Sequence, residues 1–168
     1  IGTYQSVSVQ LLPELVREMR IVAPDLAITL VENDFNEDLT EELVAGEIDV
    51  TFLQGPYEDG RLDIVDLGFD PYVVVLGAES GLARRFAGKA FPTKVLSGLS
   101  MVGQNPPSRG RDPIDDQLRA HGVKTRYVFR SNDNGAMQGM VRAGMGPAVM
   151  PLLAVDTSDP GIVIKRLD

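Results

Sequence analysis

The centre of the chain reads Pro71-Tyr72-Val73-Val74-Val75-Leu76, a continuous apolar run rich in β-branched residues. A strand that is buried on both faces needs an apolar side chain at every position, as strands of parallel α/β sheets do. The run therefore predicts a central strand covered on both sides. We expect the chain to cross here from a first lobe, residues 1–70, into a second lobe, residues 71–151, with residues 152–168 returning to the first lobe.

Strand and helix patterns alternate on the N-terminal side of this run. Strands are predicted over residues 1–4, 25–32, 48–53 and 62–67, and a helical spacing of apolar residues begins at Leu12. Pro13 predicts a kink in that helix, because proline lacks an amide hydrogen and crowds the preceding turn. Asn36 is predicted to cap a second helix that runs through Ala45, and Gly46 to end it.

The same alternation restarts on the C-terminal side. Strands are predicted over residues 100–103, 125–130, 147–150 and 162–166. Asp112 and Pro113 are predicted to begin one helix as its cap and first residue, and another is expected over residues 134–143. Alternation of this kind is typical of sheets covered by helices, so the sequence predicts an α/β protein with two Rossmann-like lobes.

The charge, the cysteine content and the lengths of the apolar runs exclude several classes of function. The chain has 24 acidic and 16 basic residues and a formal charge of -8, and it contains no cysteine. Non-specific DNA affinity rests on Lys and Arg, so these 168 residues are not expected to bind nucleic acid themselves. The absence of cysteine excludes disulfides, thiolate zinc sites and a cysteine nucleophile. No apolar run approaches the roughly 20 residues that a membrane-spanning helix needs.

Motifs for catalysis or metal binding are missing from the sequence. There is no P-loop, no H-E-x-x-H and no G-x-S-x-G, and the single histidine, His121, precedes Gly122 at a predicted helix end. A protonated histidine is favoured at a helix C-terminus, which explains His121 better than a role as general base. Four acidic residues, Glu37, Asp38, Glu41 and Glu42, cluster at helical spacing and are interpreted as a solvated helix face rather than as a cation site. The sequence therefore predicts no enzyme, no metal and no cofactor.

Small polar residues gather instead where predicted strands meet predicted helices. In open α/β sheets, ligands bind beyond the carboxyl ends of the strands, where the free amide groups of helix N-termini suit an anion. Each such residue alone is explained as well by a cap or a turn, but several together favour a binding site. The candidate binding residues are Thr3, Ser6, Asn36, Gln54, Gly103, Gln104, Asn105, Asn132 and Asp133.

Ordered motifs give the chain a resemblance to a known family. They are Ile1-Gly2-Thr3-Tyr4-Gln5-Ser6, Leu12-Pro13-Glu14-Leu15, Ala23-Pro24-Asp25, Gly46-Glu47-Ile48-Asp49, Asp70-Pro71-Tyr72, Leu82-Ala83, and the pattern V-x-A-G-x-G-x-A-x-x-P over residues 141–151. In this order they resemble the effector-binding domain of LysR-type transcriptional regulators. The resemblance runs from residue 1 to about residue 151.

The resemblance implies a fold and a function. The fold would be that of type II periplasmic binding proteins, with a small-molecule effector bound between the lobes and Ser6 on the family's usual serine or threonine contact. The effector would be a carboxylate or an aromatic metabolite. The protein would be cytoplasmic and would form homodimers or tetramers, in which the first helix packs near the helix of residues 113–120 of another chain. It would bind DNA only through an N-terminal helix-turn-helix domain absent from this chain, and a C-terminal strand and helix would also be missing.

Two other functions remain open from the residues themselves. A solute-binding protein of a transport system would share the fold. An enzyme on a similar fold would need a catalytic group in the cleft, for which only Asp133, Arg109 and Arg111 are available. Either arginine, if it reached the cleft, would favour a carboxylate or phosphate ligand, although both are also explained as solvated loop residues.

Overall fold

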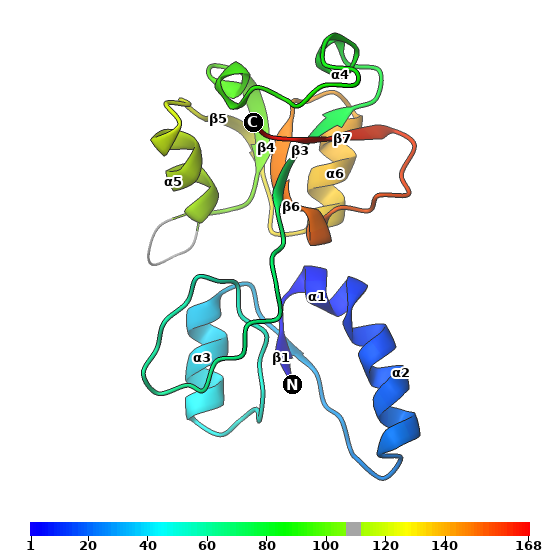
Figure 1. Ribbon diagram of the computed structural model, residues 1–168, viewed down its shortest axis with the longest axis vertical. Coiled ribbons are helices and arrows are strands. Elements are labelled where there is room, and N and C mark those ends of the chain that lie inside the picture. Colours follow the sequence, from blue (N-terminus) through cyan, green and yellow to red (C-terminus); the bar gives the residue numbers. More distant parts are fainter. Residues whose placement is uncertain (107–111) are drawn as a thin grey trace. The chain divides into compact units, whose positions relative to one another are not determined.

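The computed structural model describes residues 1–106 and 112–168, which divide into two compact units: unit 1 is Ile1–Phe69 and unit 2 is Asp70–Asp168 (Figure 1). The predicted lobe boundary at residues 70 and 71 lies within one residue of this division. Arg109 and Arg111, which the sequence suggested as possible ligand contacts, lie outside the described residues. Within the described residues, no helix is both long enough and apolar enough to cross a membrane.

Unit 1 is built around a short parallel sheet. Strand β1 (Gly2–Thr3) pairs with β2 (Val31–Glu32). On the other side of β1, the amide of Gly2 donates to Val50 O at 2.8 Å, and the amide of Phe52 donates to Gly2 O at 3.0 Å. Helices α1 (Gln5–Gln10), α2 (Leu12–Val22) and α3 (Asn36–Val44) complete the unit. Its fully buried apolar side chains include Val7, Leu12 and Leu39.

The predicted kink at Pro13 appears as the break between α1 and α2. Leu11 ends α1 and also serves as the N-cap of α2, so Pro13 occupies the second position of the new helix. At that position the missing amide hydrogen costs nothing, because the first amides of a helix have no partner inside it. Gly46 follows α3 with a φ of +75°, a conformation that favours glycine and explains the predicted end of this helix.

The other predicted strands of unit 1 are shorter than expected. Residues 25–32 form a strand only at Val31–Glu32, and residues 48–53 form only an isolated bridge between Thr51 and Gly2. Residues 62–67 form no strand, and Val65 and Leu67 are more than three-quarters exposed. An alternating pattern becomes a strand only where a neighbour accepts its hydrogen bonds, and residues 62–67 have no such neighbour among the described residues.

Unit 2 contains a five-stranded sheet with the order β5-β4-β6-β3-β7. Its strands are β3 (Tyr72–Gly77), β4 (Ser100–Gly103), β5 (Arg126–Arg130), β6 (Ala148–Pro151) and β7 (Ile162–Arg166). Strand β4 is parallel to β5 and β6, whereas β3 is antiparallel to β6 and β7. The helices are α4 (Gly81–Arg85), α5 (Pro113–Ala120) and α6 (Asn134–Arg142), with short 3-10 helices η1 (Thr93–Leu96) and η2 (Leu152–Ala154).

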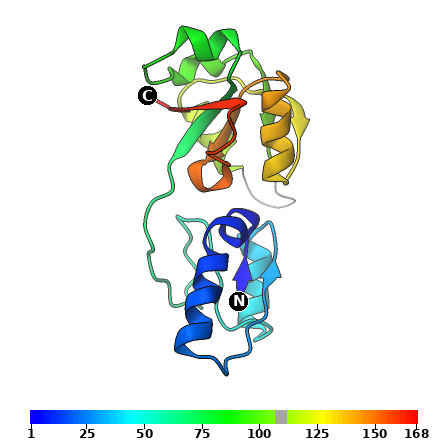
Figure 2. The same ribbon diagram turned by 90° about the vertical axis from the view of Figure 1, so that its right-hand side faces the viewer.

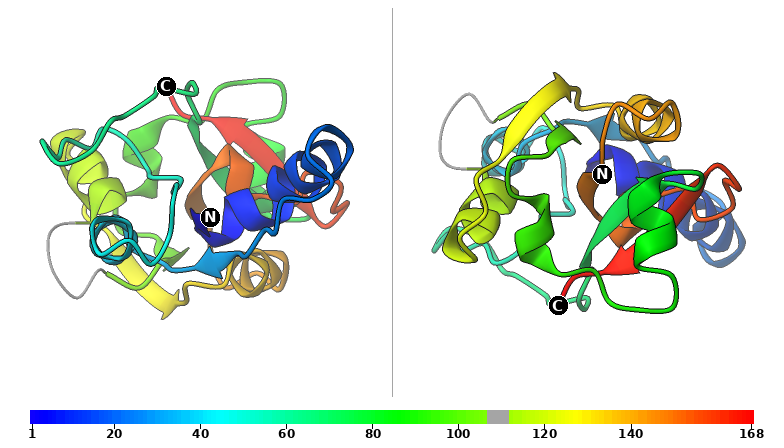
Figure 3. Two further views of the ribbon diagram at one scale, coloured as in Figure 1. Left: turned by 90° about the horizontal axis from the view of Figure 1, so that it is seen from below. Right: turned by 90° about the horizontal axis from the view of Figure 1, so that it is seen from above.

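Strand β3 is buried on both faces, as its composition predicted. Val74 and Leu76 face a core that includes Phe91, Leu96 and Leu118. Val73 and Val75 face a second core that includes Met137, Val141 and Met150. Elements therefore cover both sides of the sheet, with α4, η1 and α5 on one side and α6 on the other (Figures 2 and 3).

The expectation that residues 152–168 return to the first lobe is corrected by the structure. These residues belong to unit 2, where β7 forms the sheet edge beside β3 and pairs Ile164 with Val75. Ile162 is buried in the second core, and the amide of Phe91 donates to Arg166 O at 2.8 Å. The chain therefore gains both apolar burial and sheet hydrogen bonds by remaining in unit 2.

Candidate functional site

In unit 1, Thr3 and Ser6 lie where β1 leads into α1. Both are almost completely buried, at 1% and 5% exposure. Thr3 Oγ1 donates to Tyr4 O at 3.3 Å and accepts from Ser8 Oγ at 3.5 Å, so its hydroxyl is engaged within the fold. The Ser6 hydroxyl makes no hydrogen bond to any residue in the ranges 1–106 and 112–168, and the N-cap Tyr4 supplies no side-chain cap to α1. Ser6 thus keeps its hydroxyl available at a helix N-terminus.

The other two predicted residues of unit 1 bind each other. Asn36 Nδ2 donates to Gln54 O at 2.7 Å, and the amide of Gln54 donates to Asn36 Oδ1 at 2.9 Å. The N-cap of α3 is Phe35 rather than Asn36, because Asn36 already has helical geometry and uses its side chain in this reciprocal pair. The pair fixes the chain at Gln54 to the start of α3. Asn36 therefore holds the backbone in place with the two atoms that a ligand would otherwise contact.

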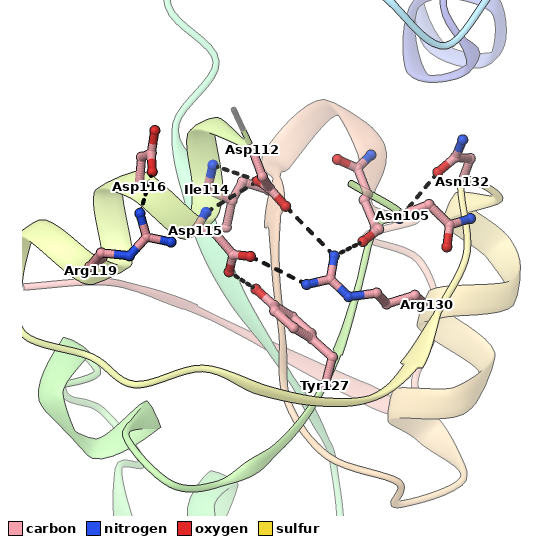
Figure 4. A network of polar contacts seen from close by, with 10 residues as sticks. Asn105, Asp112, Ile114, Asp115, Asp116, Arg119, Tyr127, Arg130 and Asn132 are labelled. Carbon is pink, nitrogen blue, oxygen red and sulfur yellow. Dashed lines mark hydrogen bonds and ion pairs between the residues drawn. The ribbon is translucent and has the colours of Figure 1, made fainter. Parts of the chain in front are cut away.

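In unit 2, the predicted residues meet beyond the ends of the neighbouring parallel strands β4 and β5. The amide of Ser131 donates to Gly103 O at 3.1 Å, and the amide of Asn105 donates to Asn132 Oδ1 at 3.2 Å (Figure 4). Asp133 caps α6 by accepting from the amide of Ala136 at 2.7 Å. The structure thus brings Gly103, Gln104, Asn105, Asn132 and Asp133 together in one place.

A half-buried arginine, Arg130, organises the surroundings of this group (Figure 4). Its guanidinium donates to Gln104 O at 2.5 Å and to the Asp115 carboxylate at 3.3 Å, and it lies 3.8 Å from the Asp112 carboxylate. It also lies 3.9 Å from the centre of the Tyr127 ring, whose hydroxyl donates to Asp115 at 2.6 Å. One cation therefore connects the end of β4 to the first turn of α5.

The sequence did not indicate Arg130, Tyr127 or Asp115 as members of this group. By strict alternation along a strand, residues 127 and 130 point to opposite faces. The pairing of β5 with β4 contains a bulge that passes over Val128, so Phe129 is paired with Val102 and Arg130 with Gly103. A bulge re-aims the side chains that follow it, which brings Arg130 over the Tyr127 ring. The arginines at both ends of β5 and the tyrosine at its second position were visible in the sequence, but the bulge depends on the partner strand.

Gly103 leaves room for this ring. A Cβ atom at residue 103 would lie 2.3 Å from Tyr127 Cε1, far inside van der Waals contact. A side chain here would displace the tyrosine and with it the hydrogen bond to Asp115. Gly103 therefore contributes to the candidate site by leaving space for the Tyr127 ring, and not by offering a polar side chain.

Two groups of the Arg130 network have perturbed protonation. Burial raises the pKa of Asp112, and the nearby Asp115 carboxylate raises it further, although amide hydrogen bonds and Arg130 oppose the shift. Burial also raises the pKa of Tyr127, and its hydrogen bond to Asp115 adds to the rise. The phenol therefore stays protonated at neutral pH, and Asp112 retains its proton to a higher pH than an ordinary aspartate.

Asp112 is expected to make the stability of unit 2 depend on pH. Its pKa is higher in the folded chain than the ordinary value of 3.8, so the folded state binds the proton more tightly than the unfolded state. The free energy of unfolding should therefore fall as pH rises from about 4 through the folded pKa of this group. Asp112→Asn retains a capping oxygen but cannot ionise, so it should lack this part of the decline.

Urea unfolding followed by circular dichroism across this pH range measures the effect. Asp112→Ala serves as the comparison: it removes the bonds from Asp112 to the amides of Ile114 and Asp115, and should cost about 1 kcal/mol at each pH. The alternative result is that the free energies of unfolding of wild type and Asp112→Asn differ by the same amount at every pH. That result would show that burial of this carboxyl group does not control its protonation.

The residues that the sequence weighed as a general base or as a cation site have structural explanations. His121 Nδ1 lies 2.9 Å from Gln117 O at the end of α5. Glu37 and Asp38 stand in the exposed first turn of α3, and Glu41 pairs with Arg61 at 2.9 Å. Among the described residues, no three histidine, cysteine or acidic side chains are arranged to hold a metal ion.

The curated relatives of this chain are regulators of transcription. An uncharacterized HTH-type transcriptional regulator, YfeR of Shigella flexneri, is 24% identical over 168 residues, which cover 99% of this chain and 53% of that protein. The chain spans about half the length of the curated relatives it matches.

Solved structures share the fold. The reduced regulatory domain of OxyR from Pseudomonas aeruginosa superimposes with a TM-score of 0.79 at 22% identity, over 99% of this chain and 80% of that one. The effector binding domain of BenM with its effector benzoate gives a TM-score of 0.81 at 20% identity, over 99% of this chain and 75% of that one. The chain thus has the type II periplasmic-binding-protein-like fold that the sequence predicted. The family described as LysR substrate binding domain matches residues 1–168, and the chain belongs to that family.

Proposed function

We propose that this chain is the small-molecule effector-binding and dimerisation domain of a bacterial LysR-type transcriptional regulator. The family and the relatives named as HTH-type transcriptional regulators support this function rather than that of a transport receptor. The family consists of transcriptional regulators, which supports a sensing rather than a catalytic role. In the whole regulator, a helix-turn-helix domain would bind DNA in the cytoplasm, and the effector would control that binding.

One observation carries the proposed binding site: the uncommitted hydroxyl of Ser6. The Thr3 hydroxyl and the Asn36 amide are bonded within unit 1, whereas the Ser6 hydroxyl makes no hydrogen bond to a described residue. A polar group in a nearly buried residue gains most from a ligand that satisfies it. Ser6 is therefore proposed as the principal effector contact of unit 1, with Asn105 and Asn132 as the polar contacts of unit 2.

The proposed effector is a carboxylate or an aromatic metabolite. A serine hydroxyl beside the uncapped first turn of α1 can donate to a carboxylate oxygen, and helix amides add a favourable dipole. Benzoate, the effector bound to the BenM domain, combines both chemical features in that relative. In unit 2, Arg130 is held by two aspartates, so neutral amides rather than this cation would meet the effector.

The effector would act by binding one arrangement of the two units more tightly than another. A ligand shifts a conformational equilibrium only by the difference between its affinities for the two states. In a dimer, that shift would change how the DNA-binding domains are held. Exposed apolar side chains on unit 1 support self-association: Val9, Leu11, Leu15, Ile21 and Val22. Following the family resemblance, this first helical segment would pack near α5 of another chain.

The test of the site is ligand binding by a serine variant. A panel of aliphatic and aromatic carboxylates is screened by thermal shift, and any acid that stabilises the chain is titrated by calorimetry. Ser6→Ala should weaken its binding by about tenfold to a hundredfold, because a hydrogen bond to a charged group is worth roughly 1.5–3 kcal/mol.

Ser8→Ala provides the matched control, because Ser8 lies on the same helix and its hydroxyl bonds to Thr3 within the fold. Its affinity for the acid should match that of the wild type. Equal affinities of wild type and Ser6→Ala would remove Ser6 from the site, and a panel without any stabilising acid would contradict the proposed effector class.

A further inference from the structure

One peptide group just beyond the end of β4 is held from both of its polar ends by side chains. Its carbonyl, that of Gln104, accepts from the Arg130 guanidinium at 2.5 Å, and its amide, that of Asn105, donates to Asn132 Oδ1 at 3.2 Å (Figure 4). The carbonyl and the amide of one peptide group lie in a single plane. The two bonds therefore fix the orientation of that plane, and Arg130 and Asn132 are here called the peptide clamp.

Side chains replace backbone groups at the point where the pairing of β4 with β5 ends. The last residue of β4 is Gly103, whose carbonyl accepts from the amide of Ser131 at 3.1 Å. The next carbonyl, that of Gln104, accepts from the Arg130 side chain instead. Backbone beyond a strand end opens more easily than backbone inside the hydrogen-bonded ladder. The orientation of Asn105 therefore depends on the peptide clamp.

Arg130 is itself held in one position. Asp115 accepts from its guanidinium at 3.3 Å, the Asp112 carboxylate lies 3.8 Å away, and the centre of the Tyr127 ring lies 3.9 Å from the guanidinium carbon. Only 26% of the Arg130 side chain is exposed. A planar guanidinium bonds to several acceptors at once in a fixed geometry. Because two carboxylates offset its charge and Gln104 O takes one of its donors, Arg130 is suited to hold the backbone.

We propose that Arg130 is a positioning residue for effector binding. It fixes the Gln104–Asn105 peptide group and so holds the Asn105 side chain in the orientation in which it would contact the effector. A binding group that is held before the ligand arrives loses less conformational freedom on binding, which strengthens the affinity. This role rests on the proposed effector site, in which Asn105 is a contact of unit 2. The affinity would then depend on a residue that does not touch the effector.

Amide hydrogen exchange of the ligand-free chain, measured by NMR, tests the peptide clamp without any effector. In Arg130→Met the Asn105 amide should exchange about tenfold faster, because its peptide group is no longer held at the carbonyl. The amide of Val102, which donates to Pro147 O at 2.9 Å within the sheet, is the internal reference and should keep its exchange rate. Equal acceleration of both amides would show general loss of stability and would overturn the inference.

Calorimetry measures the effect on affinity. The probe is the member of the carboxylate panel, which begins with benzoate and succinate, that gives the largest thermal shift. Arg130→Met should bind this acid about tenfold more weakly than wild type does. Arg119→Met is the matched control, because it makes the same change of charge and breaks an ion pair of 2.7 Å with Asp116 on α5. Its affinity for the acid should match that of the wild type.

A double-mutant cycle separates positioning from direct contact. If Arg130 acts through Asn105, Arg130→Met should weaken binding about tenfold in the wild-type chain but less than about twofold in the Asn105→Ala chain. A guanidinium that touched the acid, or attracted it by charge, would give the tenfold loss in both chains. That result would overturn the inference.

Arg130→Lys provides a second variant in case Arg130→Met does not fold, because lysine keeps a positive charge beside Asp115. Its single ammonium cannot reproduce the forked geometry that joins Asp115 to Gln104, so we expect binding about threefold weaker and faster exchange of the Asn105 amide. An Arg130→Lys chain with the exchange rate and affinity of wild type would overturn the inference. A panel in which no acid binds would contradict the effector proposal, and with it the binding role of Arg130, whereas the exchange of Asn105 reports on the peptide clamp in either case.

Discussion

Gly146→Ala is expected to prevent unit 2 from folding correctly. Gly146 has a φ of +152°, which side chains rarely adopt, and a Cβ atom here would lie 1.9 Å from Ser100 O. The obstacle is backbone at the start of β4, which cannot rotate away as a side chain can. Moving it would break the adjacent bond from the amide of Val102 to Pro147 O, which is 2.9 Å long.

We expect this substitution to cost about 4 kcal/mol or more, close to the whole stability of a marginal domain. Chemical unfolding, or loss of soluble folded protein, measures it. Gly139→Ala is the matched control, because Gly139 lies inside α6 and a Cβ atom there meets nothing within 4 Å. That change should stabilise the chain by up to about 1 kcal/mol, since alanine favours a helix more than glycine. A Gly146→Ala chain as stable as wild type would contradict the close approach of these backbones.

Phe91→Ala is expected to have the next largest effect. Phe91 is completely buried, its ring centre lies 4.9 Å from that of Phe86, and it packs in the core that contains Val74 and Leu76. Its carbonyl also accepts from the amide of Asp168 at 3.2 Å, so the side chain fills the core while the backbone holds the end of the chain. Loss of a buried phenylalanine typically costs about 3–5 kcal/mol through lost burial and the cavity that remains.

The measurement is the midpoint and slope of denaturant unfolding, with Phe69→Ala as control. Phe69 is 89% exposed, so its removal should change stability by less than about 0.5 kcal/mol. A similar loss of unfolding free energy in Phe91→Ala and Phe69→Ala would show that Phe91 is not part of a packed core. The comparison holds the chemistry of the substitution constant and changes only the burial.

Within the candidate site, the structure distinguishes residues that hold the backbone from residues that could contact a ligand. Asn36 and Asp133 were predicted as ligand contacts, but the side chains of both form hydrogen bonds to main-chain groups. Ser6 differs, because its hydroxyl has no such bond within the described residues. This difference could not be read from the sequence, since a serine at the start of a helix is as often a cap as a ligand contact.

The features that sequence alone determined are those fixed by local chemistry. The apolar, β-branched run at residues 72–76 predicted a strand buried on both faces, and β3 forms there. Asp112 and Pro113 begin α5 as predicted, because the cap and the fixed φ of proline act within one turn. Gly46 and Gly144 have positive φ values where helices were predicted to end. The ordered motifs also identified the family, which the match over residues 1–168 confirmed.

Tertiary structure decided whatever depends on a partner distant in the sequence. The strand predicted at residues 62–67 does not form, because an alternating pattern does not supply a neighbouring strand. The segment of residues 152–168 stays in unit 2, because β3 offers it both hydrogen bonds and a core. Arg130 reaches Tyr127, Asp115 and Gln104 only because pairing with β4 introduces a bulge into β5. Local sequence sets helix caps and strand burial through interactions within a few residues. Strand register, sheet membership and ion pairs between distant residues are set by contacts that exist only after the chain has folded.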